Sequence, residues 1–338
     1  ECAYIYKSGK MIITKVPFRI SLGGGGSDLP SYYENYGGYV ISAAINKYMY
    51  LCLNEPDTSD KIKLYYAKTE VTEDASKIEH DIIRESLKYF KINKPLEIAS
   101  VSDIESGTGM GSSSSFTVAL MAALNMMQRK IISPSILAEE ACCIEINKVG
   151  KKIGKQDQYI AAHGGIQEMT FSKKGEVKVN PLPLSKEFIS ELESRMLLFY
   201  TGIRRPAALI LDNQSDSLKK KVKSQVEIMH SIKALGFDIR EALLKEDIDW
   251  LGRLFHEHWD IKRRVSFDMA NEDIDLWVSG AYNNGAIGGK LIGAGGGGFL
   301  LFVCEEGKRK QLIRHMVSLG LRFVDFGFDF DGVKIITI

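Results

Sequence analysis

The hydrophobic positions of this chain change between two spacings along its 338 residues. Residues 11–21 and 61–66 alternate apolar with polar side chains, which predicts strands with one buried face, and residues 96–101 are predicted to form a further strand. Residues 39–53 are rich in Ile, Val and Tyr and favour one or two further strands. Residues 79–90 instead repeat apolar side chains at helical spacing, which predicts an amphipathic helix.

Helices and strands continue in mixed order through the rest of the chain. Helices are predicted over 116–128, from the Ser133-Pro134 cap to about 149, over 157–162, and after residue 200 through Arg264. Strands are predicted over 195–200 and at the end of 293–303, and a closing hairpin is predicted over 323–338. Because no steady βαβ alternation is present, the pattern predicts an α+β fold. The proline-containing segment 177–184 marks the best boundary, which predicts one domain over residues 1–185 and a second over 186–338.

The composition is that of an ordinary globular protein, with 45% hydrophobic and 26% charged residues. A net charge of +1 gives no electrostatic support for nucleic acid as a partner. The five cysteines include no CxxC pair, which argues against a disulfide framework or a zinc knuckle and favours the cytoplasm. No apolar run approaches the roughly 18 residues that cross a membrane. Residues 1–10 lack the apolar core of a secretion signal and are expected to be an upstream extension.

A glycine- and serine-rich segment precedes the helical pattern of residues 116–128. It reads Gly107-Thr108-Gly109-Met110-Gly111-Ser112-Ser113-Ser114. Alternating glycines allow a turn whose backbone N–H groups point inward, and the helix start adds unpaired N–H groups and a positive dipole end. The segment therefore suits an anion such as phosphate. Taken alone, a plain loop with a serine N-cap explains it at least as well, but two further glycine runs, at 23–26 and 293–298, favour a nucleotide site.

Three familiar nucleotide motifs are excluded. Neither Gly154-Lys155 nor Gly289-Lys290 is followed by Ser or Thr, so the chain has no P-loop. A protein kinase also needs an HRD signature, and the chain contains none. The glycines of 293–298 fit the spacing of a dinucleotide fingerprint, but a strand pattern follows them where a helix is required. What remains is a phosphate cradle without a P-loop lysine.

Phosphoryl transfer also needs a metal ion and usually a carboxylate that orients the acceptor hydroxyl. Mg²⁺ prefers oxygen ligands and keeps waters, so one carboxylate and one hydroxyl can suffice. Candidate carboxylates are Glu139, Glu140 and Glu145 on one predicted helix, and Asp157 beyond it. We expect Glu139 and Glu140 on a solvated surface, whereas Asp157 can be either a helix N-cap or a catalytic group.

The three glycine-rich segments resemble the three motifs of the GHMP small-molecule kinases. Residues 17–28 (PFRISLGGGGSD) resemble the first motif, residues 107–114 the ATP-binding second and residues 285–298 the third. Residues 154–159 (GKQDQY) and 256–259 (HEHW) are similar to the branch that phosphorylates sugars at the anomeric carbon, in particular heptose 7-phosphate kinases, with fucose kinase domains as near relatives. The resemblance implies a two-domain fold with a ribosomal S5 domain 2-like N-terminal domain and a ferredoxin-like α/β sandwich as C-terminal domain.

The resemblance also implies a role for each matching residue. Ser113, and with it Ser112, would meet Mg²⁺ and the phosphates, and Glu145 would be the metal carboxylate. Asp157 would be the base that faces the sugar hydroxyl. Arg19 would stabilise both Asp157 and the developing alkoxide. The spacing from Glu145 to Asp157 is one residue longer than in mevalonate-kinase-like members, which weakens the assignment of Glu145 more than that of Asp157.

The resemblance places the sugar in a pocket at the first motif. Its residues are expected to be Asp28, Gly25, Gly26, Ser27 and, from the third motif, Gly296. Several relatives have Glu-His where this chain has Gly25-Gly26. The pocket is therefore expected to be wider than in galactokinase-like members, or to be lined by backbone.

A phosphorylated sugar needs a second anion site. Two basic clusters are candidates, Arg204 with Arg205 after a predicted buried strand, and Lys262 with Arg263 and Arg264 at a helix end. A solvated helix end explains Arg263 and Arg264 equally well. We expect His256 and His258 to be structural rather than metal ligands, because residues two apart point to different faces of a helix.

Taken together, the sequence predicts an ATP- and Mg²⁺-dependent cytoplasmic sugar kinase, with both substrates between two domains. It would transfer the γ-phosphoryl group of ATP to the anomeric C1 hydroxyl of a heptose 7-phosphate, in a pathway toward nucleotide-activated heptose. The alternatives are a kinase for an unphosphorylated sugar such as fucose or galactose or for an isoprenoid alcohol, and a non-catalytic sensor of sugar and ATP. Neither nucleic acid nor a membrane is expected as a partner, and a homodimer is considered.

Overall fold

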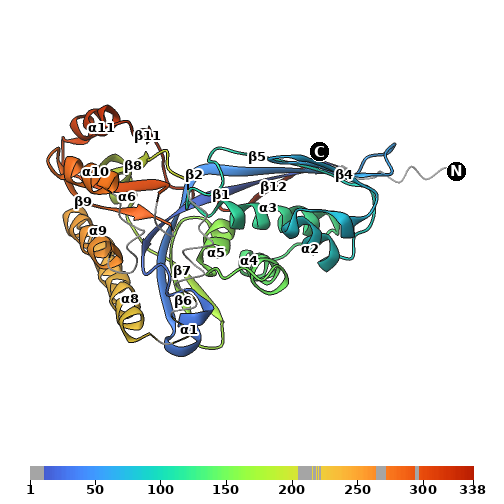
Figure 1. Ribbon diagram of the computed structural model, residues 1–338, viewed down its shortest axis with the longest axis horizontal. Coiled ribbons are helices and arrows are strands. Elements are labelled where there is room, and N and C mark those ends of the chain that lie inside the picture. Colours follow the sequence, from blue (N-terminus) through green and yellow to red (C-terminus); the bar gives the residue numbers. More distant parts are fainter. Residues whose placement is uncertain are drawn as a thin grey trace.

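The structure is a computed structural model that describes residues 11–204, 215, 218, 220, 222–263, 272–293 and 297–338. Within these residues the chain forms two β-sheets with helices packed on each, which confirms the predicted α+β class (Figure 1). No helix in this part of the chain combines the length and apolar content that a membrane crossing requires.

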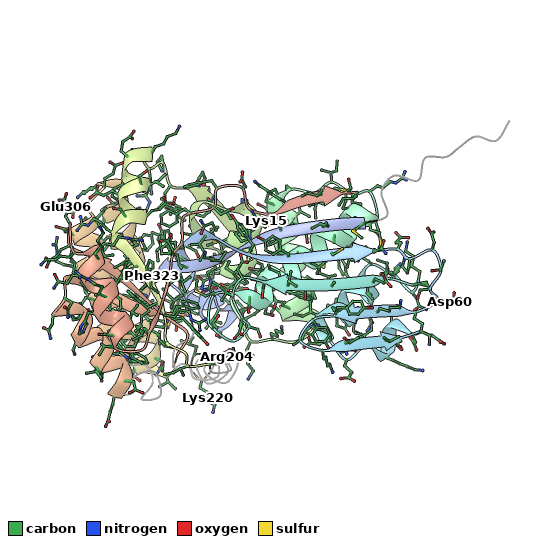
Figure 2. All side chains as sticks on the ribbon, turned by 90° about the horizontal axis from the view of Figure 1, so that it is seen from above. Lys15, Asp60, Arg204, Lys220, Glu306 and Phe323 are labelled. Atoms are coloured by element: carbon green, nitrogen blue, oxygen red, sulfur yellow. The ribbon has the colours of Figure 1, made fainter. Side chains whose placement is uncertain are left out.

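The first sheet has the strand order β12-β1-β2-β5-β3-β4, and β6 and β7 extend it beyond β2. Its strands are β1 (Met11–Gly23), β2 (Gly38–Asn54), β3 (Ile62–Tyr65), β4 (Thr69–Thr72), β5 (Glu97–Ser102), β6 (Ile166–Phe171), β7 (Val177–Pro181) and β12 (Lys334–Thr337). The segment predicted as one or two strands is the single strand β2, long enough to pair with β1, β5 and β6. Seen from above, these strands extend toward Asp60, away from Glu306 and Phe323 (Figure 2).

The helices of the first half of the chain pack on the first sheet or on one another. They are α1 (Pro30–Tyr36), the short helix η1 (Ala75–Lys77), α2 (Asp81–Tyr89), α3 (Ser112–Met127), α4 (Pro134–Cys142), the π-helix η2 (Cys143–Lys148) and α5 (Gln156–His163). Helix α3 packs against β1 and β2 and against α5. It is apolar on nearly every side, and its residues from Ser114 to Asn125 are buried, as expected of a helix enclosed by a sheet and other helices.

The second sheet has the order β11-β8-β10-β9. Its strands are β8 (Met196–Tyr200), β9 (Ala286–Ile292), β10 (Phe299–Cys304) and β11 (Arg322–Val324), and its helices are α6 (Lys186–Arg195), α8 (Lys223–Leu244), α9 (Ile248–Arg263), α10 (Glu272–Tyr282) and α11 (Arg309–Ser318). Helix α8 packs on β1 and β2, whereas α9 packs on β9 and β10, so this helix pair joins the two sheets (Figure 1).

Two predicted elements differ from the structure. Residues 323–338 do not form a hairpin, because β11 pairs with β8 in the second sheet and β12 pairs with β1 in the first, with Ile12 opposite Thr337. Alternation gives the period of a strand but not its partner, so it could not reveal this return to the first sheet. The helix predicted from Ser133 ends as α-helix at Cys142 and continues as the π-helix η2. The division into residues 1–185 and 186–338 stays a prediction.

Candidate active site

A cavity of about 580 Å³ lies where the first sheet, α3, α5, α9 and β9 meet. It brings together most of the predicted site residues. These are Arg19, Gly25, Gly26, Asp28, Gly107, Gly109, Gly111, Ser112, Ser113, Ser114, Glu145 and Asp157. Loop residues 150–154 and side chains from both halves of the chain complete its wall. The cavity has the size and the convergent polar groups of a small-molecule site.

The glycine–serine loop has the backbone that its sequence predicts. Gly107, Gly109 and Gly111 have φ angles of 79°, 81° and 79°, which lie in the left-handed region that favours glycine. Helix α3 begins at Ser112, and its N-cap Gly111 provides no side-chain cap. The first-turn N–H groups of α3, at the positive end of the helix dipole, thus adjoin the cavity wall, where a phosphate would be bound.

Glycines of the third motif support this loop. A Cβ on Gly293 would lie 2.6 Å from the Cα of Gly109, and one on Gly298 would lie 2.2 Å from the carbonyl oxygen of Thr108. Both distances are too short for a side chain, so the second and third motifs can pack this closely only because residues 293 and 298 are glycines. Gly293 also lines the cavity. Gly296 lies outside the described residues, and its assignment to the sugar pocket stays a prediction.

Arg19 and Asp157 form a two-bond ion pair in the cavity wall. The Nε and Nη2 atoms of Arg19 each donate to one carboxylate oxygen of Asp157, both at 2.7 Å. Arg19 also donates from Nη1 to the carbonyl oxygen of Gly109, at 2.6 Å. A Cβ on Gly111 would lie 3.1 Å from Asp157 Oδ2, so the carboxylate touches the phosphate loop. The N-cap of α5 is Lys155, which excludes the N-cap alternative for Asp157.

Glu145 is fully buried on the π-helix η2 and accepts three hydrogen bonds. Its Oε1 accepts from Ser113 Oγ at 2.7 Å and from Lys151 Nζ at 3.3 Å, and its Oε2 accepts from Gln158 Nε2 at 2.7 Å. Lys151 Nζ also donates to Ser113 Oγ, at 2.8 Å. Single π-helical turns are frequent at functional sites.

The oxygens of Ser113 and Glu145 fit a Mg²⁺ ion. They are hard ligands, they lie side by side at the start of α3, and the ammonium of Lys151 already places a positive charge against both. No group of three His, Cys, Asp or Glu side chains among the described residues could hold a metal. An ion here would therefore complete its coordination with water and phosphate oxygens, as Mg²⁺ commonly does.

Asp28 lies on the side of the cavity formed by the first motif. It is 2% exposed and accepts hydrogen bonds from the backbone N–H of Gly26 at 2.9 Å and of Gln156 at 3.1 Å. Burial raises the pKa of Asp28, the negative charge of Asp157 raises it further, and the N–H groups oppose both. Gln156 donates its side-chain amide to Asp28 at 3.3 Å, and its Oε1 has no partner among the described residues. Gln156 itself lines the cavity, which makes it a candidate to contact a sugar hydroxyl.

Three basic side chains reach the cavity from the second half of the chain. They are His258 and Lys262 of α9 and Lys290 of β9. Sequence reasoning placed Lys262 in a candidate phosphate cluster, but it assigned His258 to a structural role and gave Lys290 none. The four-residue spacing of His258 and Lys262 could have predicted that the two share a site, because residues four apart lie on one side of a helix. Gln156 and Gln158 were also missed, since amide side chains carry no charge pattern.

Other predicted residues lie away from the cavity lining. Ser27 is fully buried, donates to the carbonyl oxygen of Gly24 in its own loop and accepts from the backbone N–H of Tyr39 in β2. Arg204, which Figure 2 labels, is exposed. It pairs with Glu105. Arg263 pairs with Asp275, and Glu139 and Glu140 bond to Lys155 and Asn125. His256 is exposed and contacts Tyr282, so the two histidines do lie on different faces of α9. Arg205 and Arg264 are outside the described residues.

Comparison with known proteins gives a consistent family. The model of the GHMP kinases N-terminal domain matches residues 75–165, and that of the GHMP kinases C-terminal domain matches residues 239–320. A relative named D-glycero-alpha-D-manno-heptose 7-phosphate kinase, from Campylobacter jejuni, is 32% identical over 96% of this chain and 98% of its own length. A galactokinase from Pyrococcus furiosus is 24% identical over 89% of this chain and 91% of its own.

Solved structures agree with this result. A D-glycero-D-manno-heptose 1-phosphate kinase from Bacteroides thetaiotaomicron has a TM-score of 0.79 and 28% identity, with 97% of this chain and 99% of that chain covered. A structure described as a putative sugar kinase from Campylobacter jejuni has a TM-score of 0.78 and 30% identity over the same shares of the two chains. The two-domain fold implied by the motifs is thereby confirmed. The chain belongs to the GHMP kinase family, and it is a sugar kinase that transfers phosphoryl groups to an alcohol.

Proposed function

We propose that this kinase transfers the γ-phosphoryl group of ATP to the C1 hydroxyl of a heptose 7-phosphate and forms heptose 1,7-bisphosphate. The observation that carries the proposal is the contact between the Arg19–Asp157 ion pair and Gly111 of the phosphate loop. It puts a carboxylate that can receive the hydroxyl proton next to the place where the nucleotide phosphates would bind. The choice of acceptor rests on the 32% identical relative and on the basic groups in the cavity.

The catalytic steps follow from the positions of the side chains. Asp157 accepts the proton of the acceptor hydroxyl, and Arg19 fixes the orientation of the carboxylate through two hydrogen bonds. Arg19 also donates to Gly109, so it couples the carboxylate to the phosphate loop. The N–H groups at the start of α3 neutralise charge on the transferred group. Most of the rate acceleration would thus come from positioning and charge stabilisation.

We assign the Mg²⁺ site to Ser113 and Glu145. A bound ion would neutralise phosphate charge next to the transferred group. Gln158 holds the second oxygen of Glu145, so the first stays directed at Ser113. Asp28 and Gln156, with backbone of Gly25 and Gly26, would bind the sugar hydroxyls. A cytoplasmic location and a homodimer stay predictions.

A panel of acceptors tests the substrate assignment. ADP release would be measured with heptose 7-phosphate, the unphosphorylated heptose, fucose, galactose and mevalonate. We expect the highest kcat/KM with heptose 7-phosphate. A plain sugar that is used equally well would refute the phosphorylated acceptor, and sugar binding without ADP release would support the sensor instead. The presence of Ser113, Glu145, Asp157 and Arg19 in one cavity argues against a sensor.

A further inference from the structure

Three basic side chains in the cavity have no acidic partner within the part of the chain that the structure describes. His258 is 3% exposed, and neither of its ring nitrogens has a hydrogen-bond partner there. Lys290 is 2% exposed and donates to the carbonyl oxygen of Leu22. Lys262 is partly buried and donates to the carbonyl oxygen of Gly293 at 2.5 Å. Carbonyl oxygens provide hydrogen bonds but no full negative charge.

The same groups repel one another. Burial lowers the pKa of His258 and of Lys290, and nearby positive charge lowers both further. Burial also lowers the pKa of Lys262 to about 8, and Arg19 adds to the effect. Asp157 is the carboxylate at this wall, and both its oxygens are already bonded to Arg19. Uncompensated buried charge is costly, so this wall of the cavity is built to receive an anion.

We propose that His258, Lys262 and Lys290 form a phosphoryl-binding site distinct from the glycine–serine loop. Two ammonium groups and one imidazole can together donate to the oxygens of a phosphate dianion, as charge-assisted hydrogen bonds require. His258 and Lys262 lie one helical turn apart on α9, and Lys290 faces them from β9. The identity of the ligand rests on the proposed function, but the presence of the site does not.

The phosphate can come from two sources. Lys290 contacts Leu22 of the first motif, on the side of the expected sugar pocket. Lys262 contacts Gly293, which packs on Gly109 of the phosphate loop. The site therefore borders both the acceptor and the nucleotide, and it can hold either the acceptor's own phosphate or the terminal phosphate of ATP. Binding measurements on the whole chain separate the two.

Isothermal titration calorimetry would compare the wild type with Lys262→Met and His258→Gln. The probes are heptose 7-phosphate, the unphosphorylated heptose and Mg²⁺ with the non-hydrolysable analogue AMP-PNP. Arg263→Met is the matched control, since Arg263 is the adjacent cation on α9 but is exposed and pairs with Asp275. We expect each site variant to bind one of the two phosphate ligands about 10- to 100-fold more weakly than the wild type does. The affinities of the control should stay within about twofold of the wild type.

The ligand whose affinity falls in the site variants identifies the source of the bound phosphate. A loss with heptose 7-phosphate alone assigns the site to the acceptor, and a loss with AMP-PNP alone assigns it to the nucleotide. A second readout is proton uptake at pH 8, measured in two buffers of different ionisation enthalpy. A bound dianion should raise the pKa of Lys262 from about 8, so the wild type should take up more protons than Lys262→Met, in which His258 and Lys290 remain.

The site and the proposed function can fail separately. If the wild type shows no turnover with heptose 7-phosphate but AMP-PNP binding depends on Lys262, the acceptor is wrong and the phosphoryl site stands. If AMP-PNP and heptose 7-phosphate both bind the two folded variants as tightly as they bind the wild type, the site is refuted. Thermal melting establishes that each variant is folded.

Discussion

Replacing Asp157 by Asn removes the proposed base and keeps the size and shape of the side chain. Both oxygens of Asp157 accept from Arg19 at 2.7 Å, and an amide would turn one acceptor into an N–H group that faces the guanidinium. One charge-assisted hydrogen bond is thereby lost, at about 1.5–3 kcal/mol. The Asp157 side chain is 22% exposed, so water can reach the freed donor and the smaller figure applies to stability.

The effect on turnover should be larger than the effect on stability. General base catalysis contributes about 10²–10⁴-fold, so kcat should fall by that factor. The fall corresponds to about 2.7–5.4 kcal/mol in activation free energy at 1.36 kcal/mol per tenfold. Nucleotide affinity should stay within about threefold, because we assign phosphate binding to the backbone of the loop from Gly107 to Ser114 and of the start of α3.

Steady-state ADP release gives kcat, and calorimetry with AMP-PNP gives the nucleotide affinity. Asp325→Asn is the matched control, because Asp325 pairs with Arg309 on the surface and lies outside the cavity lining. A folded Asp157→Asn variant with kcat within threefold of the wild type would refute the base assignment. A parallel loss of AMP-PNP binding would instead mean that Asp157 supports the phosphate loop.

Three further outcomes follow from the same geometry. Gly109→Ala should weaken AMP-PNP binding at least tenfold, because its Cβ would lie 2.9 Å from the carbonyl oxygen of Ile292. In Gly107→Ala the new Cβ has no such contact, so the only cost is the strain of an alanine at a positive φ, and this variant should bind AMP-PNP more tightly than Gly109→Ala. Equal AMP-PNP binding by the two variants contradicts the packing argument. Glu145→Gln should raise the Mg²⁺ concentration for half-maximal activity about tenfold or more, and an unchanged Mg²⁺ titration refutes the metal assignment. The affinity for the phosphate ligand should fall as pH rises through about 8, because Lys262 is charged only below its pKa. Burial and the neighbouring Arg19 lower that pKa, and His258 and Lys290 share the cavity. A Lys262→Met variant with the same pH profile as the wild type contradicts this.

The sequence predicted the parts of the site that depend on local backbone chemistry. Alternating glycines before a helix allow left-handed φ angles, and Gly107, Gly109 and Gly111 have them. The family motifs then placed Arg19 and Asp157 in one site, although 138 residues separate them. Strand and helix periods gave most elements for the same reason, since they depend on neighbouring residues.

What escaped prediction depends on distant packing. The pairing of β12 with β1 and the direction of His258 are set by which elements meet, and a hydrophobic period contains no such information. Arg204 follows a buried strand as expected, yet Glu105 engages it outside the cavity lining. Gln156 and Gln158 act through hydrogen bonds to Asp28 and Glu145, whose positions only the folded chain reveals.

The central claim is that this enzyme transfers the terminal phosphoryl group of ATP to the C1 hydroxyl of a heptose phosphate. Phosphorus NMR of the wild-type reaction with heptose 7-phosphate labelled with ¹³C at C1 tests it most directly. The account predicts a second phosphomonoester signal coupled to C1, in equal amount to the ADP formed. A new phosphate on another carbon, or ADP formed without any sugar product, would contradict it.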